Sequence, residues 1–467
     1  MSFKKSLTFV CLLLAFSASG VTWGQQTMGP LRICADNPRY FADKEGRALL
    51  LTGSHVWYNL VDMGPEDPPK AFDYDAYLAW MKKYNHNFMR MWAWEMVQWN
   101  TKPNGAHARK DVTMFYVAPY PWLRCGDGKA LDGKPKFDLT KFDPAYFTRL
   151  RQRVEAARQN GIYVSIMLFE GWAMQRIEDG FKTHPFNPQN NVNGINGDAN
   201  GDGKGLEVHE LVIPEVTEIQ KAYIRKVVDT VNDLDNVLYE ISNENHPAST
   251  PWQYAMIRYI HEYEKGKPQQ HPVGMTFQYA GGKNQDLFDS PADWISPNPE
   301  GGYRDNPPAN DGKKVILNDT DHLWGIGGNQ AWVWKSFMRG LNPLFMDPYD
   351  GVVLGSPFDP KFEPVRRSMG YALRLARGLN LNKCLPRNEL STTGYCLANP
   401  GQQYLIYQPQ AKAQFDVQLR ENQYNVEWFD PSKGMEVSSQ RIVAGEQPTA
   451  FTNPLDSDAV LYIYLSP

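Results

Sequence analysis

Short apolar runs alternate with longer amphipathic segments along most of the chain. The runs cover 48–53, 88–92, 162–169, 237–241, 272–277, 293–296, 314–318 and 343–346. Between them, the residue pattern predicts helices over 73–85, 143–160, 215–233, 252–265 and 363–379, with Asp73 and Asp143 as N-caps. Strands that alternate with helices favour a parallel sheet with helical crossovers. Eight such strands predict an α/β fold of the (β/α)8 TIM-barrel type.

From residue 382 onward the pattern changes to short alternating segments separated by Gly, Pro and Asn. These segments are 404–407, 415–419, 424–429 and 459–465. Alternation with period two is typical of strands that bury one face, so we expect a small antiparallel β-sandwich. The predicted domains are therefore a barrel over 25–381 and a sandwich over 382–467.

The first 24 residues have the pattern of a secretory signal peptide. Lys4 and Lys5 precede an apolar run over 7–16, and small residues follow it. We therefore expect a secreted or periplasmic protein. No later apolar run approaches the 18 residues of a membrane span, so no membrane-bound segment is expected.

Four cysteines remain once the signal is removed: Cys34, Cys125, Cys384 and Cys396. An even number in an exported chain favours two disulfides. The short separation of Cys384 and Cys396 favours a bridge between them, which leaves Cys34 to pair with Cys125.

The charge is close to balanced, with 48 basic and 52 acidic side chains. This balance gives no reason to expect a nucleic acid or an anionic membrane as a partner. We expect a monomer. The high aromatic content, 13% with 14 Trp, is typical of sugar-binding clefts but also of large cores.

Polar and aromatic residues follow seven of the eight predicted strands. In a TIM barrel the active site lies at these C-terminal strand ends. The residues are His55, Trp57, Arg90, Trp92, Trp94, Glu95, Glu170, Trp172, Asn243, Glu244, Gln278, Tyr279, Asp319, Asp321, His322 and Asp347.

Two of these residues form a candidate catalytic pair. Cleavage of a glycosidic bond needs one carboxylic acid to protonate the leaving oxygen and one carboxylate as nucleophile or base. Glu244 follows the fourth strand, and Asp319 follows the seventh, across the barrel mouth. Asp321, Asp347 and Glu170 remain alternatives for the second carboxylate.

The remaining strand-end residues are candidates for substrate binding, each with a structural alternative. Arg90 can keep a carboxylate ionised or form a structural salt bridge. His55 and His322 can bind sugar hydroxyls or loop backbone. The aromatic residues can stack on sugar rings or belong to the core; they are Trp57, Trp92, Trp94, Trp172 and Tyr279. Glu170 and Asn243 complete the set.

Several of these motifs resemble clan A glycoside hydrolases. The shared features are Arg90 on the second strand, Asn243-Glu244 after the fourth and a carboxylate after the seventh. More closely, residues 39–43 (RYFAD) followed by 51–57 (LTGSHVW) are similar to the opening of the apiosidase-like barrel families. Residues 394–401 (GYCLANPG), 404–407 (YLIY) and 428–431 (WFDP) resemble the small sandwich behind those barrels, labelled a collagen-binding domain.

The resemblance implies Glu244 as the acid/base residue. The clan usually carries Glu after the seventh strand, whereas this chain has Asp319. Aspartate is one methylene shorter, which removes about 1.5 Å of reach. The wider gap has room for a water, so both retaining and inverting hydrolysis stay open.

One loop has the ligand spacing of an EF-hand-type calcium site. Asp198, Asn200 and Asp202 occupy positions 1, 3 and 5, and Gly203 occupies position 6. Position 12 is His209 in place of Glu. The loop is either a structural calcium site or an Asn/Asp/Gly turn, and no cofactor is expected for catalysis.

We therefore predict a secreted glycoside hydrolase that cleaves a polysaccharide or oligosaccharide. Two alternatives remain. The first is a non-catalytic carbohydrate- or matrix-binding protein on a barrel scaffold. The second is a polysaccharide lyase, which needs a base beside a uronate.

Overall fold

The structure is a computed structural model that describes residues 27–102 and 109–466. The signal peptide expected at 1–24 lies outside the described residues. None of the helices within the described ranges is long and apolar enough to cross a membrane.

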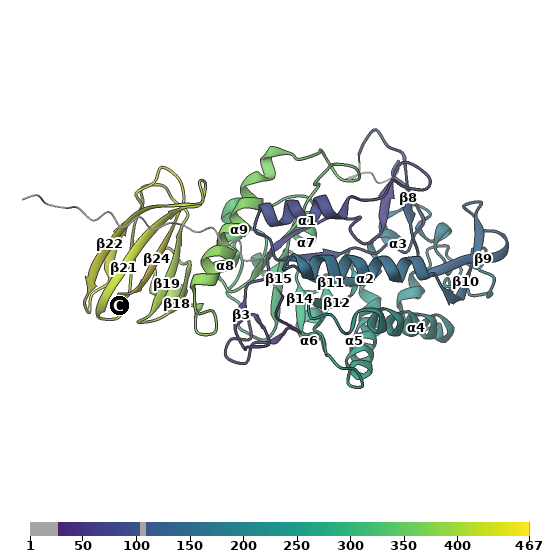
Figure 1. The fold of residues 1–467 in the computed structure, drawn as a ribbon, viewed down its shortest axis with the longest axis horizontal. Helices are drawn as coiled ribbons and strands as arrows, with labels where there is room; N and C mark the ends of the chain where they lie inside the picture. The colour runs from purple at the N-terminus through teal and green to yellow at the C-terminus, as the bar shows by residue number, and fades with distance from the viewer. Residues whose placement is uncertain (1–26, 103–108, 467) are drawn as a thin grey trace, which may run out of the picture.

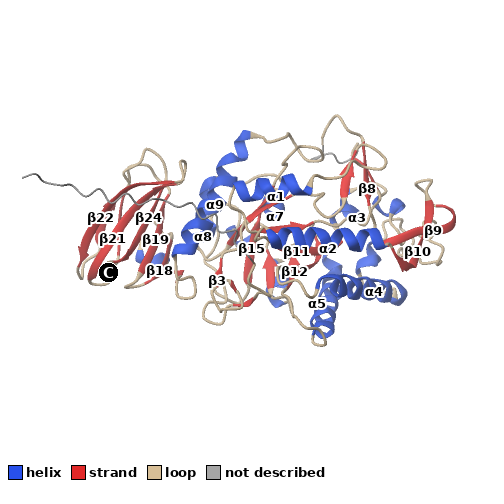
Figure 2. Ribbon diagram, viewed as in Figure 1, coloured by secondary structure: helices blue, strands red, loops and turns tan. Residues whose placement is uncertain are grey.

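Eight parallel strands form a nearly closed barrel with helices around its outside (Figures 1 and 2). The strands are β4 (Gly53–His55), β6 (Phe88–Met91), β11 (Tyr163–Glu170), β12 (Val237–Asn243), β13 (Val273–Thr276), β14 (Trp294–Ser296), β15 (Val315–Asp319) and β16 (Asn342–Met346). Hydrogen bonds join them in the order β4-β16-β15-β14-β13-β12-β11-β6. At the seam between β4 and β6, the Asn87 N–H donates to the Thr52 carbonyl at 3.0 Å. The predicted TIM barrel is confirmed.

The long helices follow the strands as the sequence predicts. They are α1 (Tyr74–Lys83), α2 (Pro144–Gln159), α4 (Pro214–Val231), α5 (Thr250–Glu264) and α9 (Glu363–Gly378). Asp73 and Asp143 accept hydrogen bonds from the N–H groups of Ala76 and Ala145, which confirms both predicted caps. The structure adds α6 (Asn284–Asp289) and α8 (Gln330–Met338), and two short helices at the barrel mouth, α3 (Trp172–Arg176) and α7 (Thr320–Leu323).

The first predicted strand needs a correction. Ala48–Leu49 forms β3, which pairs with β2 (Phe41–Ala42) in a separate small sheet that β1 (Arg32–Ile33) completes on the other side of β2. The barrel strand β4 begins only at Gly53, where a Cβ would lie 2.2 Å from the Phe88 carbonyl oxygen. Leu51 instead packs in the apolar cluster that includes Phe88 and Leu344. The apolar run over 48–53 therefore contains β3 and the start of β4, and hydrophobicity alone does not show where one strand ends and the other begins.

Two further sheets lie outside the eight barrel strands, and most of their residues come from the long segment after β6. One is the sheet of β5 (Asp62–Gly64), β8 (Met114–Ala118) and β7 (Gln98–Asn100). The other is the hairpin of β9 (Trp122–Lys129) and β10 (Pro135–Phe142), which extends from the barrel at the end opposite to the C-terminal sheets (Figure 1).

The C-terminal region consists of two antiparallel sheets around a separate apolar cluster. A six-stranded sheet has the order β17-β18-β19-β24-β21-β22, and a two-stranded sheet pairs β20 with β23. Their bounds are β17 (Leu385–Pro386), β18 (Cys396–Asn399), β19 (Gln403–Gln408), β20 (Gln414–Val417), β21 (Asn422–Asp430), β22 (Met435–Ala444), β23 (Thr449–Thr452) and β24 (Ala459–Leu465).

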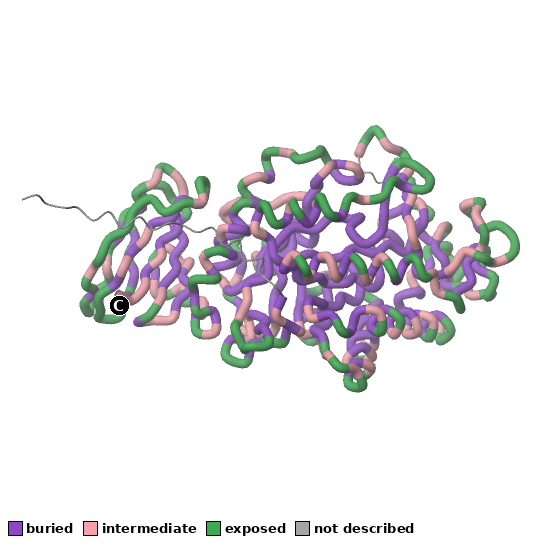
Figure 3. The backbone as a smooth tube through the Cα atoms, viewed as in Figure 1, coloured by how far each residue is buried: buried purple, intermediate pink, exposed green. Residues whose placement is uncertain are grey.

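The C-terminal sheets pack directly on the barrel. Leu405, Phe429 and Val460 belong to the same buried apolar cluster as Trp334 of α8, and the rings of Phe429 and Trp334 lie 5.9 Å apart. Figure 3 shows buried residues through the barrel and within the C-terminal sheets. The two parts therefore share core surface in addition to their separate cores.

The expected disulfides are not formed, since all four described cysteines are free thiols. Cys34 lies beside Asn382, whose Nδ2 donates to its Sγ at 3.4 Å, while Cys125 is exposed in the distant β9–β10 hairpin. Cys384 and Cys396 are both buried, but Leu385 pairs with Ala398. This register leaves the two cysteines out of step across the β17–β18 ladder.

Candidate active site

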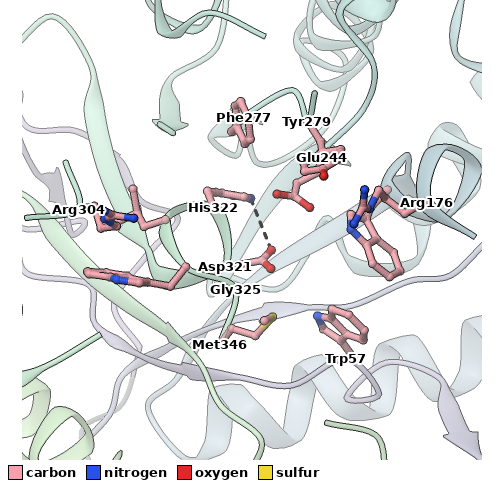
Figure 4. A pocket seen from close by; sticks show the side chains of 13 residues that line it. Trp57, Arg176, Glu244, Phe277, Tyr279, Arg304, Asp321, His322, Gly325 and Met346 are labelled. Atoms are coloured by element: carbon pink, nitrogen blue, oxygen red, sulfur yellow. Dashed lines mark ion pairs between the residues drawn. The ribbon is translucent and has the colours of Figure 1, made fainter. Parts of the chain in front are cut away.

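A cavity of about 350 Å³ lies at the C-terminal mouth of the barrel (Figure 4). Its wall comes from the loops and short helices that follow the strands, which is where TIM barrels bind substrates. The lining residues are Trp57, Trp172, Arg176, Glu244, Phe277, Tyr279, Arg304, Asp321, His322, Leu323, Trp324, Gly325 and Met346.

Glu244 points into this cavity from the end of β12 (Figure 4). Its backbone has φ 43°, a left-handed conformation that a non-glycine residue rarely adopts and that is typical of functional sites. Burial raises the pKa of Glu244 well above its usual value, and repulsion from the negative charge of Asp321 raises it further. Glu244 is therefore a carboxylic acid that keeps its proton where ordinary glutamates have lost theirs.

Asp321 reaches the same cavity from α7, and Figure 4 shows it near Glu244 and His322. Its Oδ2 accepts a hydrogen bond from Arg90 Nη1 at 2.9 Å. Burial raises the pKa of Asp321 to about 6, although Arg90 opposes the rise. The cavity thus holds two carboxyl groups whose surroundings favour different protonation states near neutral pH.

Arg90 is fully buried on β6, and its guanidinium donates hydrogen bonds to the carboxylates of Glu240, Asp319 and Asp321. Its Nε and Nη2 donate to Glu240 at 2.9 and 2.6 Å, and Nη2 also donates to Asn243 Oδ1 at 2.6 Å. Nη1 donates to Asp319 at 3.1 Å as well as to Asp321. The guanidinium is therefore both a structural ion pair with Glu240 and the cation beside the cavity.

Asp319 lies behind the cavity wall. Its side chain has no exposed surface and contacts His55 Nε2 at 2.9–3.0 Å, in addition to Arg90. Its Oδ1 accepts the N–H of Asp321 at 3.1 Å, so it caps the helix that carries that residue. Burial alone would raise the pKa of Asp319, but His55 and Arg90 outweigh it and hold the pKa below its usual value.

The other two alternatives for the second carboxylate, Glu170 and Asp347, are not among the residues that line the cavity. Glu170 is fully buried and accepts the N–H groups of Trp172 and Ala173 at 2.8 and 2.9 Å, at the start of α3. Burial raises the pKa of Glu170 to about 8. Asp347 forms a buried two-point ion pair with Arg366 at 2.6 and 2.7 Å. The oxygens of both carboxyl groups are occupied by structural contacts.

The predicted substrate-binding residues fall into two groups. The first group lines the cavity and consists of Trp57, Trp172, Tyr279 and His322. The second group lies outside the cavity wall and consists of His55, Arg90, Trp92, Trp94, Glu170 and Asn243. Members of the second group contact the first: the rings of Trp92 and Trp57 lie 5.7 Å apart, and Trp94 Nε1 donates to the Trp57 carbonyl at 2.7 Å.

His322 is oriented by contacts on both ring nitrogens. Nδ1 lies 2.7 Å from Ser296 Oγ, and Nε2 lies 3.2 Å from Asn243 Oδ1. Burial lowers the pKa of His322 well below 6.5, and the charge of Arg90 lowers it further. The imidazole is therefore neutral at ordinary pH.

Sequence reasoning missed part of the cavity wall, namely Arg176, Phe277, Arg304, Leu323, Trp324, Gly325 and Met346 as site residues. Trp324 and Gly325 directly continue the segment of Asp321 and His322, so extending that loop would have found them. Arg176 and Arg304 come from a short helix and a loop with no strand periodicity, and the sequence carries no local signal for them.

The 198–203 loop uses its side-chain oxygens for internal hydrogen bonds. Asp198 accepts the N–H groups of Asp202 and Gly203 at 3.2 and 3.0 Å, and Asn200 accepts the Asp202 N–H at 2.8 Å. Within the described ranges, no group of three or more His, Cys, Asp or Glu side chains is arranged to hold a metal ion. Calcium at this loop stays a prediction.

Comparisons with known proteins support the fold. A family model described as a domain of unknown function (DUF6298) matches residues 107–280. No curated protein matches the chain. A solved structure described as a glycoside hydrolase covers 94% of this chain and 97% of its own, with a TM-score of 0.58 and 12% identity. A glycoside hydrolase family 5 structure from Bacteroides vulgatus covers 93% of each chain, with a TM-score of 0.60 and 12% identity.

Proposed function

We propose that this chain hydrolyses a glycosidic bond, with Glu244 as general acid and Asp321 as the second carboxylate. The observation that carries the proposal is the pair of carboxyl groups at one cavity, one with a pKa raised well above its usual value and the other with a pKa of about 6 beside Arg90. Glycoside hydrolysis needs such a division between acid and carboxylate. The glycoside hydrolase descriptions of the similar structures agree with this chemistry.

Asp321 takes the place that the sequence suggested for Asp319. Three contacts occupy the oxygens of Asp319, and no surface of its side chain is open to a substrate. In this proposal Asp319 is a positioning residue, because it holds Arg90 and His55 and caps the helix that carries Asp321.

The reaction proceeds through proton transfer at the leaving oxygen. Glu244 donates its proton to the glycosidic oxygen while Asp321 either attacks the anomeric carbon or removes a proton from an attacking water. Trp57 and Trp172 offer aromatic surfaces for the sugar rings. The identity of the sugar, the likeness to apiosidase-like families, a collagen-binding tail, export and a monomeric state stay predictions from the sequence.

The test is hydrolysis by the purified protein on a panel of polysaccharides and oligosaccharides, with analysis of new reducing ends. Wild type should release products, and Glu244→Gln and Asp321→Asn should each remove the activity. Glu178→Gln is the matched control, because Glu178 is an exposed carboxylate just beyond α3 and outside the cavity wall. Glycan binding without any product from wild type would contradict the proposal and favour a non-catalytic carbohydrate-binding protein.

A further inference from the structure

Two arginines line the cavity without belonging to the network around Arg90. Arg176 comes from the C-terminal end of α3, and Arg304 comes from the loop after β14. Figure 4 shows them on opposite sides of the cavity, with Glu244 and Asp321 between them. A site for an uncharged sugar needs aromatic surfaces and a few placed polar groups. Such a site does not need two guanidinium groups, one on each side of the cavity.

Both arginines bring a positively charged side chain to the cavity wall. Asp321 already has a guanidinium partner in Arg90 at 2.9 Å. Arg176 lies over the ring of Tyr279 at 5.1 Å, a contact that holds it within the wall. Arg304 pairs with its neighbour Asp305 at 3.1 Å, and both side chains are largely exposed. An exposed pair of this kind is worth little, so an anionic ligand can replace Asp305 at low cost.

We propose that the cavity binds a glycan with an acidic group, a carboxylate or a sulfate, on a sugar next to the bond that is cut. The inference rests on the proposed function, since that function puts the bond between Glu244 and Asp321. Arginine matches the geometry of carboxylate and sulfate because it offers a planar fork of donors. Arg176, which is half-buried, contributes more than the exposed Arg304, whose charge is screened by salt.

Matched pairs of oligosaccharides test this inference. One pair compares a uronic-acid glycan with its carboxyl-reduced form, and the other compares a sulfated glycan with its desulfated form. Wild type should have a kcat/KM about 10–100-fold higher on the acidic member of one pair, the size of one or two charge-assisted hydrogen bonds. The pair that shows the preference identifies the acidic group.

Arginine variants then locate the preference. Arg176→Gln should remove most of it by raising KM on the acidic member, and Arg176→Lys should restore part of it. Arg304→Gln should have a smaller effect that disappears at high salt. Arg258→Gln is the matched control, because Arg258 lies over Tyr254 at 5.8 Å but on the outer helix α5. It should change nothing.

Binding to Glu244→Gln, measured by calorimetry, separates this inference from the proposed function. Tighter binding of the acidic member, weakened by Arg176→Gln in the same background, supports the inference even where wild type cuts nothing. Equal affinity and equal kcat/KM for both members of each pair overturn it, and hydrolysis by wild type would still stand. A preference that survives in both arginine variants also overturns it.

Discussion

Asp319 and Asp321, replaced separately by asparagine, should show different effects. Asp319→Asn should mainly lower stability, and Asp321→Asn should mainly lower turnover. Asp319 is fully buried and accepts hydrogen bonds from His55, Arg90 and the Asp321 N–H. Asparagine keeps one acceptor oxygen and presents an amide donor to groups that are already donors. The loss of about two charge-assisted bonds, at about 1.5–3 kcal/mol each, predicts a destabilisation of about 3–6 kcal/mol.

Asp321→Asn should destabilise less, because it removes one charge-assisted bond to Arg90, worth about 1.5–3 kcal/mol. It should nevertheless lower turnover by about 10²–10⁴-fold, since it removes the second carboxylate of the cavity. Folded Asp319→Asn should retain turnover within about tenfold of wild type. The assays are urea unfolding followed by tryptophan fluorescence, and initial rates at pH 7 on a confirmed substrate.

The pH dependence of the stability loss gives an independent check. The pKa of Asp319 is held below its usual value in the folded protein. A depressed pKa contributes stability that is present above the unfolded pKa of Asp, about 3.9, and that is lost as the pH falls through the folded pKa. The gap between wild type and Asp319→Asn should therefore be full at pH 7 and shrink in acid. An Asp319→Asn variant with wild-type stability and no turnover, beside an active Asp321→Asn, would refute the assignment.

Three further predictions concern pH, the metal loop and the C-terminal sheets. The acid limb of kcat/KM should fall near pH 6, because protonation of Asp321, with a pKa of about 6, removes the carboxylate; a limb near pH 4 would contradict this origin. Calcium at the 198–203 loop predicts that a chelator lowers the melting temperature of wild type but not of Asp202→Ala; an unchanged wild-type melting curve makes the loop an ordinary turn. Truncation after residue 381 should give insoluble protein, because it exposes Trp334 and its neighbours in the shared core; a soluble, active barrel would show that the sheets are independent.

The order of the barrel elements could be predicted from the sequence because each has a local signal. Asp143 before Pro144 marks the start of a helix, and the run over 162–169 is apolar except for Ser165 because β11 is buried on both faces. By contrast, β22 has almost no buried residues and therefore no alternation for a pattern to detect. The β9–β10 hairpin is similarly exposed over much of its length.

The sequence predicts that the site lies at the C-terminal ends of the barrel strands. It does not predict which of the side chains at those ends line the cavity. Asp319 and Asp321 are two residues apart, and only the turn into α7 decides which one faces the cavity. The prediction of two disulfides was wrong for a related reason. Disulfide formation depends on the relative position of two cysteines in space, whereas the sequence gives only their number and spacing. In both cases the deciding geometry is tertiary.

The most direct test of the central claim is the response of Glu244→Gln to the leaving group. The variant keeps the shape of the side chain but has no proton to donate. Hydrolysis of a substrate with a poor leaving group should fall by about 10²–10⁴-fold, while a substrate with an activated phenolic leaving group, which needs little protonation, should be affected far less. Equal losses on the two substrates, or wild-type rates on both, would contradict Glu244 as the general acid.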